Sequence, residues 1–136
     1  MSLILPIITV LLIYGIIYLV KNQNKDKILE EKTQQTISFE VKSGIEECFQ
    51  KIQNYANTSK YTIESIDENS FSIMLGENIT LTTNGFFFLI YLTFLDDSNT
   101  KVEVGIKSKT FQTGSLVNKS HQKFVDELKL HLYTNN

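Results

Sequence analysis

Residues 86 to 95 constrain the fold most, because this run of ten, FFFLIYLTFL, contains one polar side chain. Asn84-Gly85 precedes the run, and Asp96-Asp97 follows it. An Asn-Gly pair before aromatic and β-branched residues is a strong hairpin signal, because both residues tolerate the positive φ of a tight turn. The run therefore predicts a long β-strand.

Alternate side chains of a strand point to opposite faces of its sheet. One face of this strand carries Phe86, Phe88, Ile90, Leu92 and Phe94, and the other carries Phe87, Leu89, Tyr91 and Leu95. A strand with one face in water alternates apolar and polar residues, whereas both faces are apolar here. We therefore expect at least partial cover on each face, from helices on one side and from a ligand, a partner or lipid on the other.

The N-terminal region contains Leu3 to Val20, eighteen residues without a charge. A membrane-spanning helix needs roughly 17 to 25 predominantly apolar residues, and the features of a cleaved signal peptide are missing. Residues 1–20 are therefore predicted to be a transmembrane anchor. Because Lys21, Lys25 and Lys27 follow directly, the positive-inside rule favours a single-pass protein of the cell membrane with a cytoplasmic domain.

Composition limits the remaining function classes. The 136 residues carry a net charge of -2, and all thirteen basic residues are lysines. Without arginine and without net positive charge, nucleic acid is not an expected partner. The single cysteine, Cys48, cannot form an internal disulfide, and its place on an apolar helical stripe beside Phe49 indicates an inert thiol.

The segments after the anchor divide into a polar linker at 21–35, helical in part, a folded domain at 36–133 and a short tail at 134–136. Thr36 to Val41 alternates as a half-buried strand does. Ser43-Gly44-Ile45-Glu46 has the pattern of a capping box, which predicts a helix that begins there and ends near Asn57. Further strands are expected at residues 61–66, 71–75, 79–83, 86–95 and 101–107.

A final amphipathic helix is predicted from Ser115 to about Tyr133. One stripe of this helix is largely apolar and consists of Val117, His121, Phe124, Val125, Leu128 and Leu132. A helix with such a stripe needs an apolar surface to cover, and the sheet provides one. The whole order predicts an α+β domain with an antiparallel sheet and helices on one face.

This order of elements, from Ile37 to Asn57 and then through LDDSNTKVEV to the helix with Phe124, Leu128 and Leu132, resembles the helix-grip fold of the START-related superfamily of lipid-transfer and polyketide-cyclase-like proteins. The resemblance implies a curved sheet that grips the C-terminal helix around an apolar cavity. The chain departs from that family in having one helix after the first strand and one strand fewer in the meander. A TATA-binding-protein-like arrangement of strand, helix, four strands and helix is an alternative.

Catalysis is not expected from the sequence. His121 and His131 lie ten residues apart in a helix, so they point about 80° away from each other and suit no common metal ion. His121 falls on the apolar stripe, where a hydrogen-bonded core histidine is the simplest interpretation. The sequence has no phosphate-binding glycine loop and no nucleophile motif, and no metal or cofactor is predicted.

Two non-enzymatic hypotheses remain. In the first, a membrane-anchored domain binds an apolar ligand or lipid through Phe86, Phe88, Ile90, Tyr91 and His121. In the second, Phe87, Leu89 and Leu95 form an apolar face that docks on a membrane-protein partner or on another copy of the chain, giving a homo-oligomer. A third interpretation gives these aromatic residues no role beyond the core.

Overall fold

The computed structural model describes residues 4–21, 25–33, 35–77, 85–109 and 114–134, and in the first helix it describes side chains as far as Ile16. Five strands form one antiparallel sheet in the order β1-β5-β4-β3-β2. Their bounds are Thr36–Val41 for β1, Thr62–Asp67 for β2, Ser72–Gly76 for β3, Phe86–Asp96 for β4 and Asn99–Ser108 for β5. The predicted α+β class with an antiparallel sheet is confirmed.

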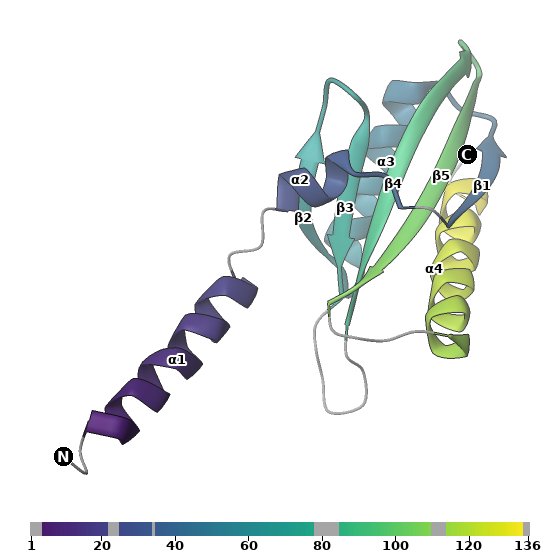
Figure 1. Cartoon of the computed structure of the whole chain (residues 1–136). Coiled ribbons are helices and arrows are strands. Elements are labelled where there is room, and N and C mark those ends of the chain that lie inside the picture. The colour runs from purple at the N-terminus through teal and green to yellow at the C-terminus, as the bar shows by residue number, and fades with distance from the viewer. Residues whose placement is uncertain (1–3, 22–24, 34, 78–84, 110–113, 135–136) are drawn as a thin grey trace.

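The long apolar strand lies at the centre of the sheet, as its composition requires. β4 pairs with β5 from Phe86↔Ser108 to Asp96↔Asn99, and on its other side it pairs with β3. β1, which is the first strand in the chain, pairs with β5 and forms one edge of the sheet (Figure 1). Both neighbours of β4 are thus strands, so only its two faces need cover.

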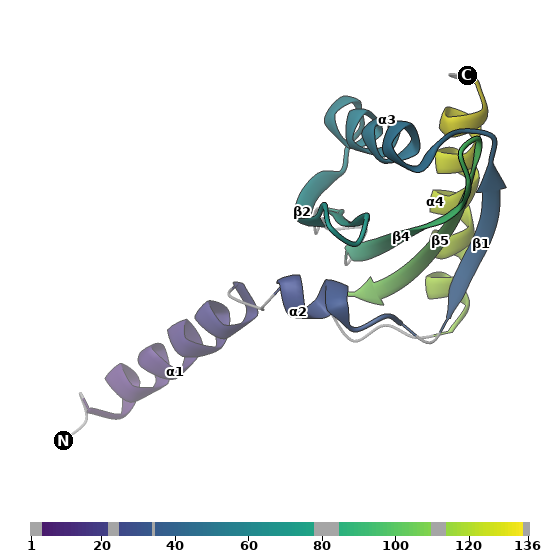
Figure 2. The ribbon, with the colours of Figure 1, turned by 90° about the horizontal axis from the view of Figure 1, so that it is seen from above.

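Helices α3 (Ile45–Thr58) and α4 (Ser115–Thr134) cover the first face (Figure 2). Their apolar stripes pack on the inward side chains of the sheet and form one large core. The ring of Phe88 stacks on that of Phe124 with a centroid distance of 4.1 Å and an interplanar angle of 8°. The predicted amphipathic helices therefore bury the stripes that the sequence assigns to them.

The second face is also covered, by a helix on the opposite side of the sheet. Helix α2 (Lys25–Glu30) lies there, and its Leu29 packs with Met74, Phe87 and Leu89 in a separate buried cluster. The prediction that helices cover one face only is therefore incomplete. The polar composition of residues 21–35 predicted a spacer. The part of this stretch that the structure describes packs against the sheet instead.

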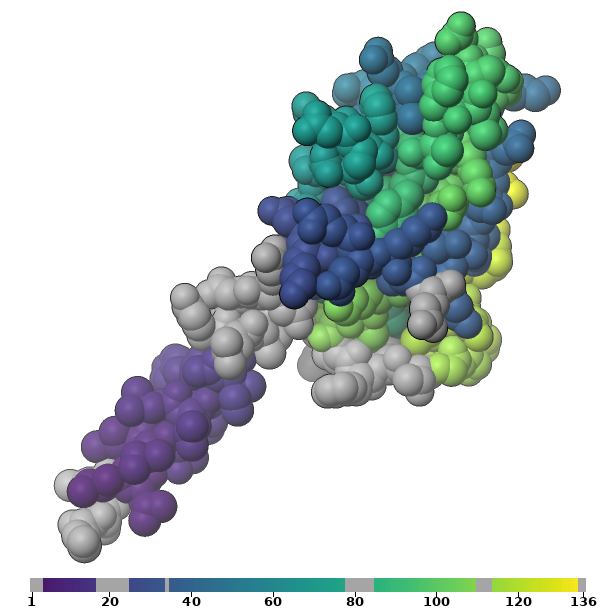
Figure 3. Space-filling view, turned by 45° about the horizontal axis from the view of Figure 1, so that its top comes forward, coloured from purple at the N-terminus to yellow at the C-terminus, as the bar shows by residue number. Residues whose placement is uncertain are grey.

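Helix α1 (Ile4–Lys21) projects away from the sheet and its helices (Figure 3). Within the residues that the structure describes, no helix combines the length and the apolar character needed to cross a membrane. The predicted transmembrane anchor over residues 1–20 (Leu3 to Val20) is therefore wrong, and so is the single-pass cell-membrane localisation with a cytoplasmic domain that depended on it.

The capping box predicted at Ser43 is also wrong. Gly44 is the N-cap of α3 and makes no side-chain cap, while the buried Ser43 hydroxyl has no hydrogen-bond partner among the described residues. The turn between β4 and β5 explains the glycine, because a Cβ at Gly44 would lie 3.0 Å from the backbone oxygen of Asp97. The strand predicted at 79–83 and the turn residue Asn84 lie outside the described residues; Gly85 has the positive φ, 73°, that the turn prediction required.

Candidate functional site

The described part of the predicted linker forms a strap, residues 25–33, which crosses the second face of the sheet. The strap begins at β2, where Lys25 forms an ion pair with Glu64. One residue further, the Ser65 hydroxyl donates a hydrogen bond to the carboxylate of Asp26 over 2.5 Å. Both contacts fix the start of α2 on the edge strand of the sheet.

The middle of the strap is held by one apolar side chain and one hydrogen bond. Leu29 is 3% exposed and lies against β3 and β4. The Tyr91 hydroxyl donates to the backbone oxygen of Leu29 over 2.8 Å, which satisfies a carbonyl at the end of the helix. Burial raises the pKa of the Tyr91 phenol to about 12, so this hydroxyl keeps its proton at neutral pH.

The end of the strap lies on β4 and β5. Lys32 Nζ is 2.5 Å from a carboxylate oxygen of Glu103 and 5.5 Å from the centroid of the Tyr91 ring. The hydrogen bond from Lys32 holds the pKa of Glu103 below its usual range. Thr33 then occupies the space that a Cβ at Gly105 would fill, so the strap passes close to β5 because that position is glycine.

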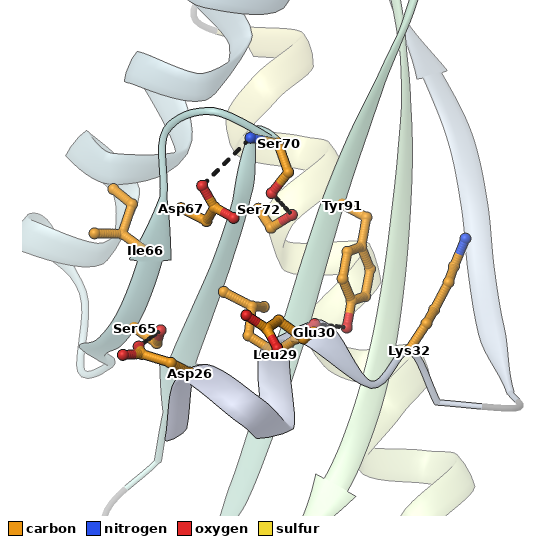
Figure 4. Close-up of a pocket in the computed structure, with 10 residues that line it drawn as sticks. All are labelled: Asp26, Leu29, Glu30, Lys32, Ser65, Ile66, Asp67, Ser70, Ser72 and Tyr91. Carbon is orange, nitrogen blue, oxygen red and sulfur yellow. Dashed lines mark hydrogen bonds between the residues drawn. The ribbon is translucent and has the colours of Figure 1, made fainter. Parts of the chain in front are cut away.

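A groove of about 610 Å³ opens beside the strap, between α2 and the β2–β3 hairpin (Figure 4). Its lining is mainly polar, with three carboxylates and one lysine. The lining residues are Asp26, Leu29, Glu30, Lys32, Ser65, Ile66, Asp67, Ser70, Ser72 and Tyr91.

The polar groups of the groove are used for local structure. Asp26 accepts the hydrogen bond from Ser65, Asp67 accepts from the backbone of Asn69 and Ser70, and the Ser70 and Ser72 hydroxyls bond to each other over 2.8 Å. The groove lining contains no histidine or cysteine, so none of its serines has an imidazole base beside it. Across the described ranges, no three His, Cys, Asp or Glu side chains are grouped to hold a metal ion.

The residues predicted to bind an apolar ligand from the first face lie in the filled core. Phe86, Phe88 and Ile90 are all buried between the sheet and the helices. His121 is 4% exposed, and its Nε2–H donates to the Val104 carbonyl over 2.7 Å. The space between β4 and α4 that a ligand would need is occupied by packed side chains.

The residues predicted on the second face divide between the strap and solvent. Phe87 and Leu89 are buried beneath the strap, and Tyr91 is half-buried beside it. Leu95 lies near the end of β4 and is 42% exposed. The structure thus brings Phe87, Leu89 and Tyr91 together and leaves Leu95 apart from them.

Sequence reasoning missed the side chains of the strap that make these contacts. Lys25, Leu29 and Lys32 belong to a polar stretch in which Ile28 and Leu29 are the only apolar residues. Two apolar residues are too few for a periodic signal. One signal was available in the sequence. Both faces of β4 need cover, and the isolated pair Ile28 and Leu29 could have been recognised as part of that cover.

Comparisons with known proteins give no family and no function. No protein-family model matches the chain, and no curated protein matches it. The solved structures that match the chain include two of low similarity. XoxI from Bacillus cereus shows 14% identity over 74% of this chain and 93% of its own, with a TM-score of 0.46; a DUF4468 family protein from Bacteroides ovatus shows 10% identity over 73% and 83%, with a TM-score of 0.31. With no matching family model and no matching curated protein, the helix-grip, START-like and lipid-binding descriptions are unsupported and are withdrawn.

Proposed function

We propose that this chain is a non-catalytic association module in which helix α1 is buried by the α1 helices of other copies. The observation that carries the proposal is the exposure of α1. Its large apolar side chains from Ile4 to Ile16 are between 49% and 73% exposed, on all sides of the helix. A helix that is apolar all round is stable when it is surrounded by other apolar surface.

The threonine in this part of α1 has its hydrogen bond satisfied within the helix. The Thr9 hydroxyl donates to the Leu5 backbone oxygen within the same helix, over 2.9 Å. The folded domain lies beyond one end of α1 and leaves its sides open (Figure 1). A bundle of α1 helices with the domains outside it would therefore bury this surface without a further component.

Sedimentation equilibrium of the full chain tests the proposal. The wild-type protein is expected to form species larger than a dimer, because a pair of helices covers only one side of each. Ile8→Lys combined with Leu12→Lys keeps helix propensity but places two charges in the bundle, and should shift the protein to monomer. Leu130→Lys is the matched control, since Leu130 is an exposed apolar residue of α4; it should leave the assembly unchanged.

Two outcomes contradict this function. A wild-type chain that is monomeric at all concentrations removes the need for a bundle. Association that occurs only when phospholipid vesicles are added means that copies of α1 are not what covers the helix. The space between β4 and α4 is filled at Phe88 and Phe124, which are each 1% exposed and in contact there, and this packing favours association over an apolar ligand in the core.

A further inference from the structure

We propose that the second face of the sheet is a docking site for the strap of a neighbouring copy, so that associated copies exchange their straps. This inference rests on the proposed association through α1. The docking site consists of Glu64, Tyr91 and Glu103 around the apolar patch of Met74, Phe87 and Leu89. The strap that occupies the site in the structure belongs to the same chain.

The contacts within the chain define which segment the site accepts. Lys25 pairs with Glu64, Leu29 enters the apolar patch, and Lys32 reaches both Glu103 and the ring of Tyr91. The site therefore recognises a short helix with a leucine that has a lysine four residues before it and another three residues after it. None of these side-chain contacts requires the strap and the sheet to belong to one chain.

Helix α2 of the strap buries a single side chain, whereas the main core of the domain is much larger, so release of the strap costs less than unfolding the domain. α2 has six residues and one buried side chain, and a helix of this length is not stable by itself. The lysine side chains at both ends are partly exposed, at 38% for Lys25 and 48% for Lys32, whereas their partners Glu64 and Glu103 are 14% and 13% exposed. Leu29 is thus the main anchor of the strap.

The position of the strap in the chain favours exchange between associated copies. α1 ends at Lys21, and the strap begins at Lys25. When the α1 helices of two copies pack together, the straps that follow them are brought close to each other, because residues 22–24 alone separate α1 from the strap. This arrangement raises the effective concentration of each strap at its neighbour's sheet, so binding between chains competes with binding within the chain.

Carbodiimide crosslinking tests the exchange in the wild-type full chain, because it joins Lys32 to Glu103 where they form the ion pair. Unlabelled and ¹⁵N-labelled copies are mixed, unfolded and refolded together, crosslinked, digested and analysed by mass spectrometry. We expect Lys32–Glu103 crosslinks with one light and one heavy peptide, in about the proportion that random pairing gives. Lys60–Glu77, a pair at 3.8 Å inside one domain, is the matched control and should give no mixed crosslinks.

The two proposals fail in different ways. If sedimentation shows association but every Lys32–Glu103 crosslink joins peptides of one isotope, strap exchange is overturned and association through α1 stands. If mixed crosslinks also appear at Lys60–Glu77, they report random collisions, and the exchange is again overturned. If the Ile8→Lys, Leu12→Lys variant is monomeric and loses the mixed crosslinks while keeping those of one isotope, both proposals are supported.

Discussion

At the scale of single residues, adjacent positions on β4 serve two separate cores. Phe88 lies in the core below α3 and α4, whereas Leu89 lies in the smaller cluster beneath the strap. Both are at most 1% exposed. From Phe86 to Leu92 the absence of apolar-polar alternation therefore reflects burial on both faces, whereas Phe94 and Leu95 are 57% and 42% exposed.

Substitution of Leu89 by lysine tests this burial. Leu89→Lys places a charge in an apolar cluster and should lower the free energy of unfolding by about 3 kcal/mol or more. Phe88→Ala, on the other face, should lower it by about 3 to 5 kcal/mol. Thr93→Lys, on the same face of β4 but exposed, should change it by less than about 0.5 kcal/mol. Urea denaturation measures all three, and a harmless Leu89→Lys would show that the second face is wet.

Three tyrosines, of which Tyr55 and Tyr61 are buried and Tyr91 is half-buried, predict alkaline destabilisation. Burial raises the pKa of Tyr55 and of Tyr91 to about 12, and it raises that of Tyr61 as well. The folded protein thus holds these protons more tightly than the unfolded chain, in which the pKa is about 10. Stability from this source is complete below about pH 10 and is lost as the pH rises through the folded-state values.

The urea midpoint should accordingly fall between about pH 10 and about pH 12. Tyr91→Phe removes one of the three phenols and should make that fall shallower. At neutral pH the same variant loses the hydrogen bond to the Leu29 carbonyl and should be less stable by about 0.5 to 1.5 kcal/mol. A slope with pH that Tyr91→Phe leaves unchanged would show that this phenol has an ordinary pKa.

At the scale of elements, the strap depends on one leucine. Leu29→Asp should release the strap and expose the cluster of Met74, Phe87 and Leu89, because α2 has no other fully buried side chain. We expect increased binding of an apolar dye together with a circular dichroism spectrum close to that of the wild type. Glu30→Asp, at the exposed neighbouring position, is the control. Complete unfolding of Leu29→Asp would mean that the strap is inseparable from the domain.

Elements in which a pattern repeats could be predicted from the sequence, whereas α2 and the cap of α3 could not. β1 has the predicted bounds, and α4 differs from its prediction by about one residue, because alternation and the helical stripe each repeat several times within them. α2 is too short to repeat any pattern. The cap of α3 depends on the distant Asp97 backbone, which no local pattern at Ser43 and Gly44 reveals.

The candidate site could be predicted in part. The sequence indicated that Phe87, Leu89 and Tyr91 share a face and need cover, and they do share the cluster beneath the strap. The strap that covers them is held by contacts with residues that are distant in the chain. Lys25 and Lys32 find Glu64 and Glu103, which are 39 and 71 residues away in the chain, and pairings at such separations follow from the order of the strands.

At the scale of the whole molecule, the interior is filled and the unsatisfied apolar surface lies outside it. The first-face core holds packed aromatic rings, and the second face is closed by the strap. α1 is the element whose described apolar side chains lack contacts within the domain. We therefore propose that contacts between copies of this chain are made by α1 and, through exchange, by the strap.

Hydrogen exchange of the wild-type full chain at several concentrations tests this claim most directly. The account predicts that the amides of α1 between Ile4 and Ile16 exchange quickly in dilute protein and become protected as the concentration rises, while those of β4 stay equally protected throughout. Exchange in α1 that is independent of protein concentration would contradict the claim that other copies of the chain bury this helix.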